Sequence, residues 1–234
     1  MNTSTVSVVI PAYNEEENIG DLLLRTNATL ETIGVPYEII VVDDGSIDET
    51  RLMAMKNKAT VLTNGINKGK GYTLKKGIQH ANGNLLITMD ADGSHRPEEI
   101  PKLLVPLLNG ADVVFGSRFI VKAEQDSTKK LHIFGNKLFN LLIALLTGKR
   151  VMDSQTGFRA YKKKIIEEIE ITSNGYEVDT ELTVKSLKNG YIIHEEPITF
   201  ERRKDGSSYL NPLRDGIKIF NIIVRASISA RKKD

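Results

Sequence analysis

Two aspartates separated by a single alanine follow a short apolar segment near the middle of the chain. The segment, Leu85–Met89, is typical of a strand buried on both faces, so Asp90 and Asp92 leave its carboxyl end together. Open α/β sheets bind their ligands at that end of their strands. Neighbouring carboxylates repel one another unless a cation or hydrogen-bond donors hold them, and hard divalent ions bridge such groups to phosphate oxygens. Taken alone, the pattern is explained equally well by a metal site and by an acidic turn before a helix that begins near Pro97.

The composition excludes several classes of protein. The 234 residues suit one large α/β domain, and 40% apolar with 26% charged residues is typical of a soluble globular protein. A net charge of +2 is too small to indicate nucleic acid as a partner. The chain has no cysteine, which excludes disulfides, thiolate metal sites and a cysteine nucleophile.

The amino terminus leads directly into an apolar strand and lacks the charged start and cleavable apolar core of a signal peptide. No apolar stretch reaches the roughly 20 residues that span a bilayer. We therefore expect a cytoplasmic protein, or one that is bound peripherally to the cytoplasmic face of the cell membrane.

Strands and helices alternate over the first half of the chain. This alternation predicts an α/β fold with a mostly parallel central sheet, helices on both faces and right-handed crossovers. The predicted strands are Val6–Ile10, Tyr37–Val42, Val61–Thr63, Leu85–Met89 and Asp112–Phe115, with helices from about Glu15, after Asp48 and over Tyr72–Ala81. The side chains that follow the strand ends, and are expected at one edge, are Tyr13, Asp43, Asp90, Asp92 and Arg118.

The second half is less regular. We expect helices over Leu131–Thr147, over Thr180–Asn189 and from Asn211, a strand at the sheet edge over Ile192–Phe200, and a polar turn over Asp153–Ala160. The predicted organisation is one main domain over residues 1–210 and a C-terminal amphipathic helix within 211–234.

That last helix carries an apolar stripe with basic residues beside it. A helix of this kind can lie in an anionic membrane interface, and Leu131–Thr147 is apolar almost all round. The alternative is that these helices pack in the core or in a homodimer. The stripe is formed by Leu213, Ile217, Phe220, Val224 and Ile228.

Six ordered motifs carry a resemblance that covers nearly the whole chain. They are PAYNEEEN from Pro11, VVDDGSIDET from Val41, NKGKGYTLKKGI from Asn67, MDADGSHRPEEIP from Met89, GSRF from Gly116 and TGFRAY from Thr156. Together they resemble the family 2 glycosyltransferases, and among these the dolichol-phosphate and polyprenyl-phosphate sugar synthases. The resemblance implies a GT-A fold with a Rossmann-like sheet. The loop 202–212 and the segment EVDTEL are similar to those of archaeal N-glycosylation glycosyltransferases.

The resemblance implies a nucleotide-sugar site at the sheet edge. The Asp43 carboxylate would accept N–H groups of the base and Tyr13 would stack on it. From the residues alone, Tyr13 is better explained as a partly buried core aromatic. The alternative for Asp43 and Asp44 is a pair of turn-forming acids ahead of Gly45. The full set expected to bind the donor is Pro11, Tyr13, Glu15, Asp43, Asp44, Lys70, Asp90, Ala91, Asp92 and Arg118.

In the family, the second Asp of the DAD motif binds Mg²⁺ or Mn²⁺ on the donor diphosphate. Here that residue is Asp92, supported by Asp90, and Ser94 could supply a further oxygen. Many dolichol-phosphate mannose synthases read DADLQHP, whereas this chain has Gly93 and Ser94 in place of the Leu and Gln.

An acceptor phosphate monoester needs no catalytic base, because its second pKa of about 6 leaves it largely ionised at neutral pH. Four histidines without a Ser-His-Asp order fit that expectation. Cations must instead hold two phosphorylated reactants. The resemblance implies catalytic roles for Asp92, Arg118 and Arg203, and acceptor-phosphate binding by Lys130, His132, Arg159 and Arg203. For each arginine the alternative is a surface ion pair.

Three acids, Glu177, Asp179 and Glu181, could orient sugar hydroxyls, pair with arginines, or simply begin a helix. The predicted activity is an inverting, metal-dependent hexosyltransferase that moves a hexose or N-acetylhexosamine from a UDP- or GDP-sugar to dolichyl or polyprenyl phosphate. One alternative is the same fold acting on a glycan or other soluble acceptor, with one of these acids as base. Another is an inactive nucleotide-sugar-binding module. A NAD-binding domain is disfavoured, because no GxGxxG follows the first strand.

Overall fold

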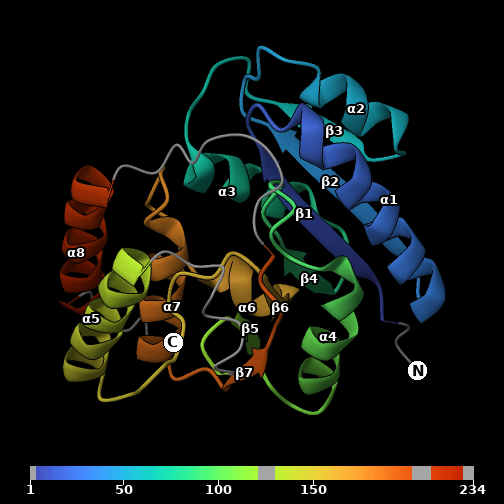
Figure 1. Ribbon diagram of the computed structural model, residues 1–234. Helices are drawn as coiled ribbons and strands as arrows, with labels where there is room; N and C mark the ends of the chain where they lie inside the picture. Colours follow the sequence, from blue (N-terminus) through green and yellow to red (C-terminus); the bar gives the residue numbers. More distant parts are fainter. Residues whose placement is uncertain (1–3, 121–129, 202–211, 229–234) are drawn as a thin grey trace.

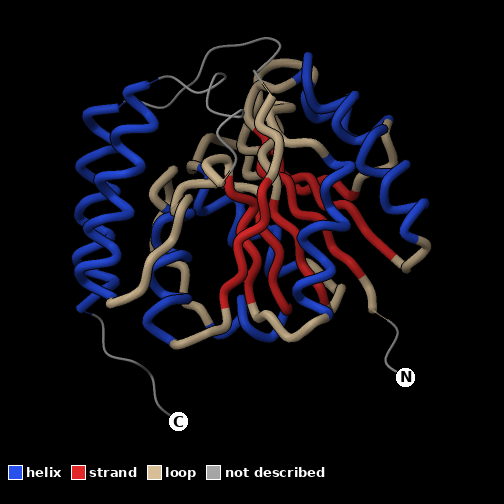
Figure 2. The backbone as a smooth tube through the Cα atoms, turned by 60° about the horizontal axis from the view of Figure 1, so that its bottom comes forward, coloured by secondary structure: helices blue, strands red, loops and turns tan. Residues whose placement is uncertain are grey.

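The structure, a computed structural model, describes residues 4–120, 130–201 and 212–228. In this part of the chain, seven strands form a single sheet in the order β3-β2-β1-β4-β6-β5-β7 (Figures 1 and 2). The strands are β1 Val6–Ala12, β2 Tyr37–Asp43, β3 Thr60–Thr63, β4 Leu85–Thr88, β5 Val113–Ser117, β6 Arg159–Lys162 and β7 Ile193–Pro197. All run parallel except β6, which lies antiparallel between β4 and β5.

Helices cover both faces of the sheet, as Figure 2 shows. On one face α1 (Glu16–Ile33), α2 (Thr50–Lys56) and α4 (Ile100–Leu108) pack, the last after a 3₁₀ turn over Pro97–Glu99. On the other face lie α3 (Lys70–His80), α6 (Lys163–Glu168) and α7 (Val178–Asn189). The helices α5 (Lys130–Thr147) and α8 (Pro212–Ile228) lie side by side outside α7 (Figure 1).

The central strands are buried on both faces because their apolar residues are continuous. In β1, Val8 and Ile10 belong to the core under α1, whereas Val9 belongs to the core under α3. A side chain at Gly77 of α3 would overlap the Val9 side chain, so this glycine lets the helix lie close to the sheet. These contacts hold the loops after β1, β2 and β4 at one edge.

Most of the predicted elements are confirmed, and one prediction is wrong. The polar turn expected over Asp153–Ala160 ends early, because Arg159–Lys162 forms β6. Phe158 and Ala160 face one core while Tyr161 faces the other. A buried arginine within this alternation made a central strand resemble a polar segment. The short helix α6 was also not predicted.

The C-terminal helix α8 contributes Ile219 and Ile223 to the same core as α7. Exposed apolar side chains lie on its other side, among them Ile217, Phe220 and Ile228. The division into residues 1–210 and 211–234 stays a prediction. Of the helices in the described ranges, none has both the length and the apolarity needed to cross a membrane.

Candidate active site

The carboxyl ends of β1, β2, β4 and β5 meet at one edge of the sheet, because these strands are parallel. The predicted donor-site residues follow these ends. The antiparallel strand β6 begins at the same edge, where Arg159 is opposite Thr88 and Phe115. Two positions from the second half of the chain, Asp153 and Asp179, complete the site.

The two acids after β2 are buried and hold the neighbouring loops. Asp43 Oδ1 accepts the Ser46 N–H at 3.0 Å. Asp44 accepts the backbone N–H groups of Lys68 and Gly69, at 2.9 and 2.8 Å. The φ of Gly45 is +76°, and a Cβ there would lie 2.6 Å from the backbone of Ile66. Asp44 thus anchors the glycine-rich loop that leads into α3.

Pro11, near the end of β1, and Tyr13, in the loop after that strand, are both half-buried. Glu15 is buried and acts locally, since its Oε2 accepts the Asn18 side-chain amide at 2.9 Å. Ala91, the middle residue of the DAD motif, is buried. The donor-binding roles of these residues stay predictions.

Lys70 lies between two carboxylates that are 89 residues apart in sequence. Its Nζ is 2.6 Å from Asp90 Oδ1 and 2.7 Å from Asp179 Oδ2. Burial favours a lower pKa for Lys70, but the charges of Asp179 and Asp90 outweigh burial and raise its pKa above the ordinary value. Burial raises the pKa of Asp179, whose side chain is 6% exposed. Lys70 therefore stays charged across the neutral range.

Asp90 is held from three directions. Burial opposes its ionisation, yet the Lys70 ammonium and His95 keep its pKa well below the ordinary range. His95 Nε2 lies 3.5 Å from Asp90 Oδ2. A Cβ at Gly157 would overlap the Asp90 carboxylate, which explains the glycine of the TGFRAY motif. Asp90 is thus a fixed anion rather than a mobile surface acid.

Asp92 differs because only one of its oxygens is engaged within the described residues. Its Oδ1 accepts the Ser94 N–H at 3.0 Å and the Ser94 hydroxyl at 2.6 Å. Its Oδ2 has no hydrogen-bond partner among those residues. The φ of Gly93, +70°, makes this turn possible. A fixed carboxylate with one unengaged oxygen suits a hard cation.

The buried Ser94 hydroxyl is directed to Asp92, so its own metal contact stays a prediction. No group of three or more His, Asp or Glu side chains that could enclose an ion is found within residues 4–120, 130–201 and 212–228. An ion here would take its other ligands from bound phosphate and water.

Arg118 follows β5 and forms a forked ion pair with the buried Asp153. Its Nε is 2.6 Å from Asp153 Oδ2, and its Nη2 is 2.8 Å from Oδ1. Burial favours a lower pKa for Arg118, but Asp153 outweighs it and raises that pKa. The Asn136 amide of α5 also donates to Asp153, at 2.7 Å. Sequence reasoning missed Asp153, because the sequence shows only that this residue begins a polar segment. Its burial and its pairing with Arg118 come from the structure.

The predicted acceptor-phosphate residues are spread over different environments. Arg159 has no exposed surface: its guanidinium donates to the backbone oxygens of Thr156 and Ser154 and lies over the Phe115 ring. Lys130 and His132 lie in the first turn of α5. Arg203 lies outside the described residues. Acceptor roles for all four stay predictions.

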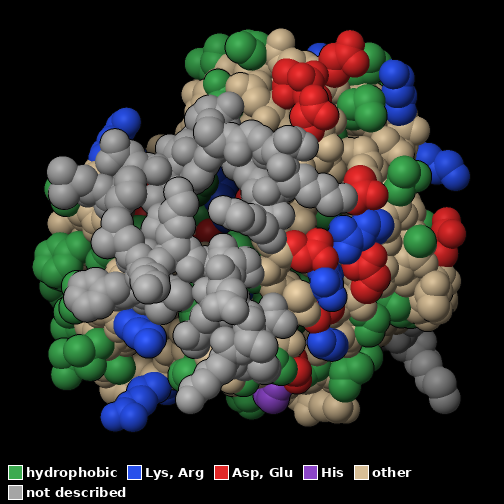
Figure 3. Space-filling model, in the orientation of Figure 1, with side chains coloured by type: hydrophobic (Ala, Val, Ile, Leu, Met, Phe, Trp, Pro, Cys, Tyr) green, Lys and Arg blue, Asp and Glu red, His purple; other side chains and the backbone are tan. Residues whose placement is uncertain are grey.

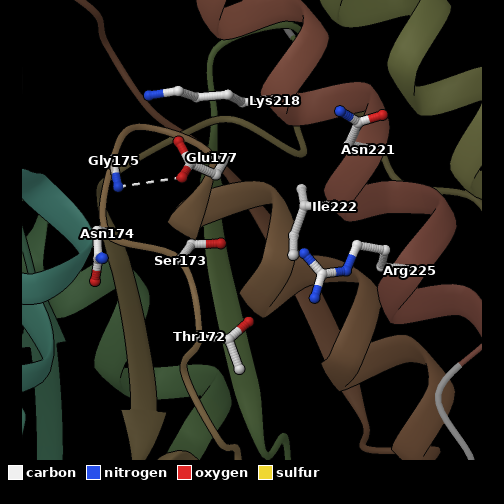
Figure 4. A pocket seen from close by; sticks show the side chains of 9 residues that line it. All are labelled: Thr172, Ser173, Asn174, Gly175, Glu177, Lys218, Asn221, Ile222 and Arg225. Carbon is white, nitrogen blue, oxygen red and sulfur yellow. Dashed lines mark hydrogen bonds between the residues drawn. The ribbon is translucent and has the colours of Figure 1, made fainter.

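The three acids near the start of α7 separate into three environments. Asp179 contacts Lys70, whereas the buried Glu181 accepts the backbone N–H groups of Thr172 and Ser173 and pairs with Lys185 at 2.6 Å. Glu177 accepts the Gly175 N–H and lines a cavity of about 420 Å³ between α8 and the loop before α7 (Figure 4). The cavity is lined by Thr172, Ser173, Asn174, Gly175, Glu177, Lys218, Asn221, Ile222 and Arg225.

The sequence pattern of the family "Glycosyl transferase family 2" matches residues 7–170, which include both aspartates and Arg118. The chain belongs to glycosyl transferase family 2. It is therefore a glycosyltransferase, as its motifs predicted.

Two curated relatives of this family 2 member are named for lipid-phosphate sugar transfer. The polyprenol monophosphomannose synthase of Mycolicibacterium smegmatis is 31% identical over 221 residues, which cover 89% of this chain and 82% of that protein. The dolichol-phosphate mannosyltransferase of Pyrococcus furiosus is 34% identical over 211 residues, 88% of this chain. The alignment spans 59% of that longer relative.

Solved structures share the fold. Glucosyl-3-phosphoglycerate synthase of Mycobacterium tuberculosis, in complex with Mn²⁺, UDP and phosphoglyceric acid, superposes with a TM-score of 0.77 at 21% identity. The match covers 98% of this chain and 80% of that one. The expected α/β architecture is thereby confirmed.

Proposed function

We propose that this glycosyltransferase moves a hexose or N-acetylhexosamine from a UDP- or GDP-linked sugar to dolichyl or polyprenyl phosphate, with Mg²⁺ or Mn²⁺ as cofactor. The observation that carries the proposal is that Asp92, with an unengaged oxygen among the described residues, lies at the same sheet edge as two permanent cations, Lys70 and Arg118. A nucleoside diphosphate needs both a metal-binding carboxylate and cations around its oxygens.

Asp92 would hold the metal ion, and Ser94 fixes the orientation of Asp92. The ion supplies charge neutralisation for the departing diphosphate. Lys70 is held by Asp90 and Asp179, so it presents its ammonium at a defined position without reorganisation during the reaction. Arg118, held by Asp153, does the same beside β5.

The acceptor supplies its own nucleophile. One oxygen of the ionised phosphate monoester forms a bond to the anomeric carbon while the bond from that carbon to the diphosphate oxygen breaks. The leaving nucleoside diphosphate keeps the electron pair, and the configuration at the carbon inverts. No proton has to be removed, which fits a site in which the half-buried Asp90 and the buried Asp179 are both paired with Lys70.

A lipid acceptor is supported by the apolar outer side of α5 and α8. Leu138, Leu141 and Leu145 of α5 are exposed, as are Ile217 and Phe220 of α8. Figure 3 shows hydrophobic side chains together with Lys and Arg on the side of the molecule where these helices lie. A basic, apolar surface suits an anionic membrane interface. The names of the two curated relatives agree with this acceptor class.

The test is a transfer assay with a panel of UDP- and GDP-sugars, a polyprenyl phosphate, and either Mn²⁺, Mg²⁺ or EDTA. We expect product on the lipid with one donor and none in EDTA. Equal rates with and without EDTA would rule out metal dependence. Transfer only to water-soluble acceptors would rule out the lipid phosphate as acceptor.

Membrane binding is measured separately by sedimentation with vesicles that contain anionic lipid. Phe220→Glu should weaken sedimentation severalfold. Leu24→Glu changes an apolar residue on α1 that is 63% exposed, against 50% for Phe220; it serves as the matched control and should bind as the wild type does. Equal binding by both variants would argue against α8 as the membrane contact.

A further inference from the structure

Two segments far apart in the sequence are joined beside the DAD motif. His95 and Phe200 form an antiparallel bridge, and the Glu201 N–H donates to the Ser94 backbone oxygen at 2.8 Å. Around this bridge, Arg96 Nε is 2.6 Å from Glu201 Oε1, and the Thr199 N–H donates to a Glu99 carboxylate oxygen at 2.8 Å. The loop after β4 and the segment after β7 therefore form one unit.

His95 occupies the centre of this unit and is 1% exposed. Its Nε2 faces Asp90 Oδ2 at 3.5 Å. Its ring stacks on Phe158, with centroids 5.3 Å apart, and meets Phe200 edge-on at 5.5 Å. Among the residues that the structure describes, its buried Nδ1 has no hydrogen-bond partner, which is unfavourable. A phenylalanine would pack here without that cost, so the histidine is explained by its contact with Asp90.

The ring of Phe200 also contacts the second cation of the site. The Arg118 guanidinium carbon lies 5.1 Å from the Phe200 ring centroid, a distance at which a cation and an aromatic ring attract one another. A continuous series of contacts thus runs from Asp90 through His95 and Phe200 to Arg118.

We propose that His95 and Phe200 are positioning residues that hold Asp90 and Arg118 in register with each other. Neither side chain needs to touch substrate. The proposal rests on the proposed function, in which Asp90 supports the metal-binding loop and Arg118 faces the phosphates. His95 has two separable roles. Its Nε2 positions Asp90, and its ring packs on Phe200, which in turn positions Arg118.

Three variants separate the two parts. His95→Phe keeps a ring and loses the contact with Asp90, so we expect the Mn²⁺ concentration for half-maximal transfer to rise about fivefold, with kcat within about twofold. Phe200→Leu should lower kcat about fivefold without changing the Mn²⁺ requirement. His95→Gln keeps a polar donor and loses the ring, so it should resemble Phe200→Leu. Tyr37→Leu, at the other end of the sheet, is the control and should change neither quantity.

Equal changes of the same parameter in His95→Phe and His95→Gln would overturn the proposal. A second measurement needs no activity: urea unfolding of His95→Gln, Phe200→Leu and the double variant. The effects on the unfolding equilibrium constant should be non-additive by roughly two- to tenfold, as for other aromatic pairs. Additive effects would show that the rings are not coupled. If the wild type transfers no sugar at all, the proposed function is wrong. The urea measurements on the two single variants and the double variant still test whether His95 and Phe200 are coupled.

Discussion

Replacing Lys70 by methionine tests the electrostatics of the site most directly. The variant leaves Asp90 and Asp179 facing one another without the ammonium that lies 2.6 and 2.7 Å from them. Breaking a buried ion pair from one side costs about 3–5 kcal/mol. Asp90 is 28% exposed, so we expect the lower value, about 3 kcal/mol at pH 8.

The loss must depend on pH in a defined direction. In the wild type, the pKa of Asp90 is depressed, so its ion pair contributes stability above the unfolded pKa of about 3.9 that is lost as the pH falls. In the variant, burial without Lys70 raises both carboxyl pKa values, so the folded state binds protons that the unfolded state has released. Stability of the variant then falls as the pH rises from about 4. The difference from wild type should therefore grow between pH 5 and pH 8.

Urea unfolding at pH 5, 6.5 and 8 measures this difference. Lys163→Met, which breaks the more exposed i,i+4 pair with Glu167 on α6, is the control and should cost at most about 1 kcal/mol. Adding Asp179→Asn to Lys70→Met should recover part of the loss, because one of the two repelling charges is removed. A pH-independent difference, or no recovery in the double variant, would refute the reasoning.

Three further predictions concern neighbouring positions. Asp92→Ala should lower transfer about a thousandfold and leave the urea midpoint nearly unchanged, because the variant loses the oxygen proposed to bind the metal rather than an apolar core contact; normal turnover would mean that the ion lies elsewhere. Gly157→Ala should displace the Asp90 carboxylate and raise the Mn²⁺ requirement in transfer assays, and an unchanged requirement would contradict the overlap. Arg118→Lys loses the buried fork to Asp153 and should destabilise the fold by about 2 kcal/mol in urea, more than the same change at Arg25, whose fork to Glu98 is more exposed to solvent; equal costs would show that burial adds little to the Arg118 fork.

Local patterns predicted much of the donor side. Continuous apolar runs marked β1, β2 and β4, and acids directly after two of them were expected at one edge because carboxyl ends of parallel strands meet there. The strand β6 was not predicted, because its alternating pattern includes the charged Arg159. Burial of this arginine is possible only because its guanidinium stacks on Phe115 and donates hydrogen bonds to backbone oxygens. The acceptor side was predicted by resemblance and remains to be tested.

The sequence by itself determined the sheet edge at which Asp43, Asp90, Asp92 and Arg118 gather, because burial patterns and strand direction are local properties. Only the tertiary structure decided the partners of these groups. Lys70 meets Asp179 because α3 and α7 pack on the same face of the sheet, and His95 meets Phe200 across more than a hundred residues. Such pairings depend on how the buried faces of helices and strands pack against one another. That packing is set by residues throughout the core, so no single sequence motif predicts it.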